Sequence, residues 1–119
     1  MLNLSDNNKE EVKYWLDVLA DGIHQWAKDK GFWPEGETRN DGEMIALMHS
    51  ELSEALEALR HGNPPLDHIP DFSGAEEEMA DCIIRILDMC AARGYRIGDA
   101  IFAKMDFNKT RPQKHGKQF

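Results

Sequence analysis

The amino-acid sequence predicts an all-α fold in one domain. Four segments place apolar residues at intervals of three and four, which is the spacing of one helix face. None shows the sustained apolar–polar alternation, rich in β-branched residues, that is typical of a half-buried strand. The 119 residues are 41% hydrophobic and 30% charged, as in globular single-domain proteins. We therefore expect residues 1–119 to form a bundle of four to five helices with a basic C-terminal tail.

The first helix is expected over about residues 7–30. Ser5 or Asp6 can cap its start, because a short polar side chain there accepts hydrogen bonds from the first free backbone N–H groups. Gly31 fits the position just after its end, where a left-handed backbone is common. The apolar positions of this segment are Val12, Leu16, Leu19, Ile23 and Trp26.

The second helix is expected over about residues 41–60, and one of its acidic residues stands out. At about 3.6 residues per turn, Glu51 falls inside the apolar arc, and Glu54 lies beside it one turn later. Glu57 and Ser50 fall on the opposite, solvated side. A buried carboxylate is costly unless it is paired or binds a metal, although a solvated acidic ladder is the common alternative. The expected core stripe is Met44, Ile45, Met48, Leu52, Ala55, Leu56 and Leu59.

The third helix is expected to open with a capping box at residues 73–76 and to end at Gly94, after a loop whose prolines exclude a continuous helix. Its apolar residues cover more than half of the helix circumference. One neighbouring helix cannot cover so wide an arc, so this helix is either central in the monomer or part of a subunit interface. The remaining polar strip faces either water or a site, and it contains Glu77, Glu78, Asp81, Arg85 and Asp88.

Two acidic pairs on two largely apolar helices indicate a metal site. If the helices pack antiparallel, Glu51 and Glu54 can meet Glu78 and Asp81. Carboxylates without histidine or cysteine suit Mg²⁺, or Mn²⁺, better than zinc. Bundles that bind two irons use Glu-x-x-His on two helices, which this sequence lacks.

The fourth helix, expected over about residues 97–109 and stopped by Pro112, leads into the basic tail. Residues 104–119 carry a net charge of +4, so the other 103 residues carry −12. Lys104, Asn108 and Arg111 share one helix face, and Lys117 follows in the tail. Cations beside a carboxylate–metal cluster suit a polyphosphate, because both neutralise phosphate oxygens. A solvated basic tail is the alternative.

Together these motifs resemble the MazG-like members of the all-α nucleoside triphosphate pyrophosphohydrolases, which include dCTP pyrophosphatases. The family pattern, ExxE followed by ExxD, reads ELSE at residues 51–54 and EMAD at residues 78–81. The ending KMDFNKTRPQKHGK is similar to the K-x-x-x-N-x-x-R-P…HGK ending of single-domain relatives. The likeness covers about residues 31–119.

The resemblance implies Mg²⁺-dependent hydrolysis of an NTP or dNTP to the monophosphate and pyrophosphate, as in nucleotide-pool housecleaning. It implies that the protein acts as a homodimer or a dimer of dimers. Some relatives carry an additional Glu where this chain has Ser50, so the general base is either Glu51 or a metal-activated water. The implied metal ligands are Glu51, Glu54, Glu78 and Asp81, and the implied phosphate-binding residues are Lys104, Asn108, Arg111 and Lys117.

Recognition of the base is the least defined part of this hypothesis. Phe32, Trp33 and Phe107 lie near loops and can stack on a base, but each can equally be a core or interface residue. Trp15 and Trp26 are expected to pack in the core. A non-catalytic helical protein that binds a nucleotide or a partner is the alternative to an enzyme.

Charge and composition exclude other classes of partner. The net charge of −8 disfavours nonspecific binding to duplex nucleic acid, and no apolar run reaches membrane-spanning length. No signal peptide is evident at the N-terminus. Cys82 and Cys90 lie eight helical residues apart, about 12 Å along the axis, which is too far for a disulfide. We therefore expect a cytoplasmic protein.

Overall fold

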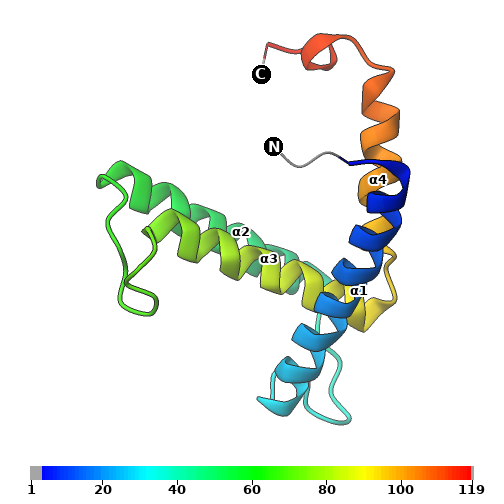
Figure 1. The fold of residues 1–119 in the computed structure, drawn as a ribbon. Helices are drawn as coiled ribbons and strands as arrows, with labels where there is room; N and C mark the ends of the chain where they lie inside the picture. Colours follow the sequence, from blue (N-terminus) through cyan, green and yellow to red (C-terminus); the bar gives the residue numbers. More distant parts are fainter. Residues whose placement is uncertain (1–3, 119) are drawn as a thin grey trace.

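The structure is a computed structural model that describes residues 4–118, and within that range it contains helices and no strand. This confirms the all-α prediction, and the four helices begin and end within one residue of the expected positions. No helix in the described range combines the length and hydrophobicity needed to cross a membrane. The elements in chain order (Figure 1) are α1 (Asp6–Asp29), α2 (Asp41–Arg60), α3 (Gly74–Arg93), α4 (Ile97–Lys109) and a short 3₁₀ helix, η1 (Gln113–Gly116).

Local capping sets the helix boundaries. The Ser5 hydroxyl accepts a hydrogen bond from the Asn8 N–H (3.2 Å), and the Asn40 side chain accepts one from Glu43 (2.9 Å). Ser73 and Glu76 form the predicted capping box at the start of α3. Gly94 ends α3 with φ of 70°, a left-handed conformation that glycine adopts at low cost.

The helices pack in successive pairs, which leaves the chain open. α2 and α3 lie side by side and antiparallel, α1 packs on α3, and α4 packs on α1 (Figure 1). The radius of gyration is 16.8 Å, compared with about 13.5 Å for a compact domain of this length. One chain therefore does not enclose all its helices around a single core. The buried cluster is Met44, Met48, Cys82 and Met89, with Trp33 and Ile86 packed against it.

The loop between α2 and α3 is folded tightly onto both helices. The Gly74 N–H donates to the Pro64 carbonyl (2.9 Å), and the Asn63 side chain accepts from the Ala75 N–H (2.8 Å). A Cβ on Gly74 would lie only 2.8 Å from the Cβ of Ala58. The start of α3 is thus held against the end of α2, and this contact fixes how the two helices align.

Much of the expected core is exposed, which corrects the sequence analysis. Trp15 and Trp26 are 57% and 51% exposed, although both were expected to be buried. A helical wheel identifies an apolar face but not whether the same chain covers it, and here each face has too few neighbours. Cys82 and Cys90 are buried and unlinked, as expected. The other large exposed apolar residues include Val12, Leu19, Ile45, Leu52, Leu56, Leu59, Met79, Ile83 and Ile84.

The close contact at Gly74 leads to the first prediction. Gly74→Ala should lower the free energy of unfolding by about 1–3 kcal/mol, because the added methyl group overlaps Ala58 and the Pro64 carbonyl. The matched control is Gly22→Ala within α1, where nothing lies within 4 Å of the added Cβ. That variant should be more stable by roughly 0.5–1 kcal/mol, because alanine favours helix interiors over glycine. Thermal unfolding measures both changes, and equal melting temperatures for wild type and Gly74→Ala would contradict the packing.

Candidate functional site

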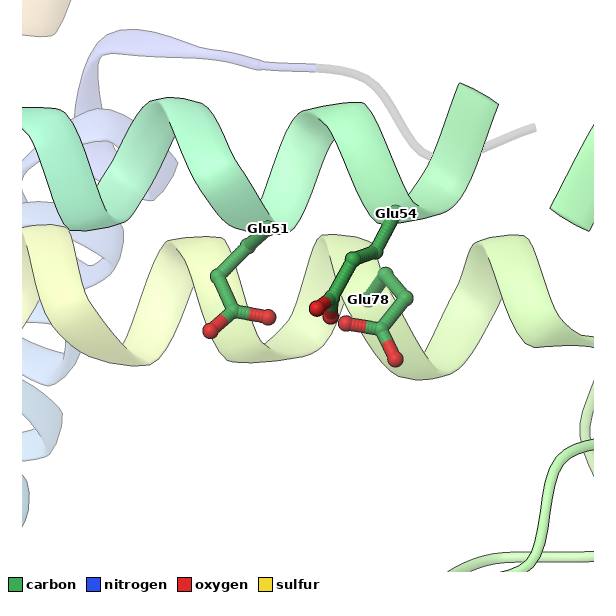
Figure 2. Close-up of side chains that lie close together, drawn as sticks. All are labelled: Glu51, Glu54 and Glu78. Atoms are coloured by element: carbon green, nitrogen blue, oxygen red, sulfur yellow. The ribbon is translucent and has the colours of Figure 1, made fainter. Parts of the chain in front are cut away.

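Antiparallel packing of α2 and α3 brings the two acidic pairs together. Glu51, Glu54 and Glu78 each place a carboxylate oxygen within 4.8 Å of the others (Figure 2). A second group, Glu77, Glu78 and Asp81, meets the same distance, so Glu78 belongs to both groups. The four residues predicted to bind metal therefore form one continuous carboxylate cluster, with Glu78 at its centre.

The cluster is partly enclosed by the helices. Glu51 is 8% exposed and Glu78 only 5%, whereas Glu54 is open to solvent. The burial of Glu51 agrees with its place in the apolar arc. Glu78 is buried beside Glu51 and Glu54, so this part of the polar strip of α3 faces α2, whereas Met79 and Ile83 point outward. The solvent alternative for this strip is thus wrong for Glu78.

Burial and charge crowding make the cluster electrostatically strained. Burial, together with the neighbouring Glu51 and Glu54, raises the pKa of Glu78 to about 8. Burial also raises the pKa of Asp81, and the charge of Glu51 adds to this effect. The Oε2 atom of Glu78 is buried without a hydrogen-bond partner in the described part of the chain. A hard cation satisfies such an atom and relieves the repulsion, so these residues fit Mg²⁺ or Mn²⁺.

Two further residues orient the cluster. The Arg85 Nε donates a hydrogen bond to Glu51 Oε1 (3.0 Å), which leaves the second oxygen of Glu51 available. Glu77 accepts from the Ile69 N–H (3.1 Å), so it is engaged in anchoring the loop. The sequence analysis placed Arg85 on the polar strip, where a solvated strip would pair it with carboxylates of its own helix; it pairs instead with Glu51 of α2. Its position one helical turn after Asp81 is the signal that would have identified it.

The basic residues of α4 and the tail lie away from the cluster in this chain. α4 packs on α1, and both α4 and η1 lie far from the middle of α2 and α3 (Figure 1). The charged groups of Lys104 and Arg111 lie 4.9 and 5.7 Å from the centre of the Phe107 ring. α4 ends at Lys109, however, so Arg111 lies beyond the helix and the predicted helix face does not extend to it. Asn108 lies half-buried beside them, and Lys117 is exposed.

A cavity of about 220 Å³ adjoins the carboxylate cluster, and of the three aromatic residues considered for base stacking only Phe32 lines it. Phe32 lines the cavity, together with Trp26. Trp33 is not on its wall: it packs against the buried cluster, and its ring is covered by the Arg39 guanidinium at 4.7 Å. Phe32 and Trp26 are thus exposed to the cavity, whereas Trp33 packs against the core.

Comparison of the chain with models of protein families, with curated proteins and with solved structures found no match. The functional argument therefore depends on the residues and on the geometry described above.

The raised pKa of Glu78 leads to a prediction about metal-free protein. Unfolding exposes a carboxyl with an ordinary pKa of 4.5, so between about pH 4.5 and 8 the folded state holds a proton that the unfolded state releases. The free energy of unfolding should therefore fall as the pH rises through this range. Glu78→Gln, which keeps the shape without the charge, should reduce this fall and raise the melting temperature at about pH 8 by several degrees.

Thermal unfolding in a chelator, measured from about pH 5 to 9, tests this expectation. Glu11→Gln is the control, because Glu11 is exposed on α1, away from the cluster, and should leave the pH dependence unchanged. The same pH dependence in wild type and Glu78→Gln would show that Glu78 is not the titrating group.

Proposed function

We propose that this protein is a Mg²⁺-dependent nucleoside triphosphate pyrophosphohydrolase that converts an NTP or dNTP to the monophosphate and pyrophosphate. The observation that carries the proposal is the meeting of the ExxE and ExxD carboxylates between two antiparallel helices. The adjoining cavity, with aromatic walls, adds a place for a base. The resemblance to MazG-like enzymes supplies the reaction type.

Glu51, Glu54, Glu78 and Asp81 would hold the metal, and their four negative charges match two divalent cations. When bound, Mg²⁺ supplies Lewis-acid chemistry, which neutralises phosphate charge and makes water more acidic. Arg85 fixes one oxygen of Glu51, so the other oxygen would either bind the metal or accept a proton from the attacking water; in the first case a metal-activated water is the nucleophile. Exposed Glu54 marks the side from which the triphosphate enters.

Assembly into a homodimer or dimer of dimers accounts for two features of the single chain. The large apolar residues exposed on α1, α2 and α3 are suited to a subunit interface. Because the basic face of α4 does not reach the carboxylates of its own chain, its phosphate-binding role requires the carboxylates of a second copy. The opposite charges of residues 104–119 and the remainder of the chain favour such a contact.

Incubation with a panel of NTPs and dNTPs plus Mg²⁺, followed by chromatography of the products, tests the proposed reaction. Release of pyrophosphate with a monophosphate is the expected result. Release of single phosphates would indicate another class of hydrolase. Nucleotide binding without turnover would favour a non-catalytic regulator, which is the alternative function.

Removal of one carboxylate should abolish the reaction without unfolding the protein. Glu54→Gln and Asp81→Asn should each lower kcat/KM by at least about 100-fold, since even residues that only orient metal ligands are worth 10–100-fold. Each should leave the melting temperature of metal-free protein unchanged or higher, because one repelling charge is lost. Glu57→Gln, one turn further along α2 on the exposed side, should keep wild-type kcat/KM. Near wild-type turnover of Glu54→Gln and Asp81→Asn would overturn the metal assignment.

The basic face should act across the subunit boundary. Lys104→Ala and Arg111→Ala should each lower kcat/KM by roughly 100-fold, as loss of a donor to a developing negative charge does. Lys109→Ala is the control, because Lys109 is paired with Asp106 and should have little effect.

Mixing two inactive variants then distinguishes action across subunits from action within one. In Asp81→Asn/Arg111→Ala hybrids, the Arg111→Ala subunit keeps its carboxylates and can receive an intact tail from its partner. Random dimers should recover about a quarter of the wild-type sites. No recovery after unfolding and refolding the mixture would show that the tail acts within its own chain or not at all.

A further inference from the structure

The cavity beside the carboxylate cluster is lined by residues that suit one flat polar ring. It lies between α1 and α3, and Glu51 and Asp81 form its border with the cluster. Pockets for drug-sized ligands occupy about 300–1,000 Å³, so a cavity of about 220 Å³ suits a base rather than a whole triphosphate. Its apolar walls are formed by Ile23, Trp26, Phe32 and Ile84. Aromatic side chains on the wall can stack on either face of a base.

A buried carboxylate, Asp88, forms part of the same wall. It is 8% exposed and is held by two ring systems from other parts of the chain. The Trp33 Nε1–H donates to both of its oxygens, at 3.1 and 3.0 Å, and His24 Nδ1 is hydrogen-bonded to Oδ1 at 2.7 Å. The Arg39 guanidinium lies 3.9 Å from Oδ2, beyond hydrogen-bond distance. The carboxylate is thus fixed in position, while Oδ2 keeps the capacity to accept another hydrogen bond.

A fixed carboxylate discriminates between the edges of bases. An ionised carboxylate only accepts hydrogen bonds, so it attracts an exocyclic amino group and repels a carbonyl oxygen at the same position. Asp88 lies seven residues, two helical turns, after Asp81 on the same face of α3, about 10 Å along the axis. A nucleotide with phosphates at the carboxylate cluster therefore extends its base toward Asp88.

We propose that Asp88 is a specificity-determining residue that binds the amino group of a nucleobase in this cavity. The preferred triphosphates are those whose base carries an exocyclic amino group on the edge opposite the sugar, such as cytosine and adenine, over their carbonyl counterparts. Arg39 and Arg85 also line the cavity, and a guanidinium group there can donate hydrogen bonds to ring nitrogen or carbonyl acceptors. The proposal rests on the proposed function for the position of the phosphates. His24 and Trp33 are positioning residues that act through Asp88.

Two matched pairs of substrates test the proposal on the wild-type protein. CTP and UTP differ at C4 by an amino group against a carbonyl, and ATP and ITP differ in the same way at C6. The amino member of at least one pair should have a kcat/KM at least about 10-fold higher, because a polar site rejects an analogue that leaves its groups unpaired. Equal values within both pairs would overturn the proposal while leaving the pyrophosphohydrolase function intact.

The variant Asp88→Asn tests the residue itself. The amide keeps the shape but can turn its NH₂ toward a carbonyl, so the ratio of kcat/KM for the favoured pair should fall at least about 10-fold, toward unity. Asp99→Asn is the control, because Asp99 lies on α4 next to Lys13 and outside the cavity, and it should keep the wild-type ratio. An unchanged ratio in a folded Asp88→Asn would overturn the assignment. If that variant does not fold, the wild-type ratios alone decide.

Calorimetric binding of CMP, UMP, AMP and IMP separates this inference from the proposed reaction. Amino nucleotides that bind at least about 10-fold more tightly than their carbonyl counterparts support the inference even if no triphosphate is hydrolysed. That result would contradict the proposed hydrolysis but support the proposed base-binding site. Absence of turnover together with absence of any such preference would overturn both.

Discussion

The contact between Gly74 and the end of α2 determines where the carboxylates of the site lie. A side chain larger than hydrogen at this position would separate the helices, because the Ala58 methyl and the Pro64 carbonyl occupy the space. With the first turn of α3 held there, each following turn has a fixed neighbour on the antiparallel α2. Glu78, one turn into α3, therefore meets Glu54, and Asp81 extends the cluster toward Glu51. The loop reinforces this alignment, since Glu77 binds the Ile69 N–H.

This alignment also gives part of α3 an unusual polarity. α3 turns Glu78 toward α2 and leaves Met79, Ile83 and Ile84 exposed, although Cys82 and Met89 of the same helix are buried in the core. The arrangement is unfavourable for a single metal-free chain, because like charges gather inside and apolar surface stays in water. A bound cation would relieve the repulsion between the carboxylates. Contact with another protein surface would remove the apolar residues from water. Carboxylates with raised pKa values of this kind occur most often at functional sites, where burial and like charges shift the pKa.

The sequence predicts those features that depend on nearby residues. Helix periodicity and caps are local, so the four helices and the burial of Glu51 follow from the pattern alone. Features that join distant segments do not. Trp33 and Asp88 are 55 positions apart, and His24 and Asp88 are 64 apart, so no spacing rule connects them. The exposed positions of Leu52 and Leu56 are missed for the same reason, because periodicity reports hydrophobicity without naming the partner. The bounds of α4 were predicted correctly, but the distance of its basic residues from the cluster depends on how α4 packs on α1.

The exposed apolar stripe of α1 has a consequence for the concentration at which this protein is stable. If a second copy covers Trp15, Leu19 and Trp26, the folded state gains free energy from each association event, and mass action ties stability to concentration. Dilution then removes the partner's basic tail and the shelter of the apolar stripe together. Any activity that needs the pair, expressed per chain, would then rise with the concentration of the protein instead of staying constant. Newly synthesised chains that have not yet paired would expose this apolar stripe to other proteins. Pairing during synthesis, or binding by a chaperone, would then protect them from aggregation.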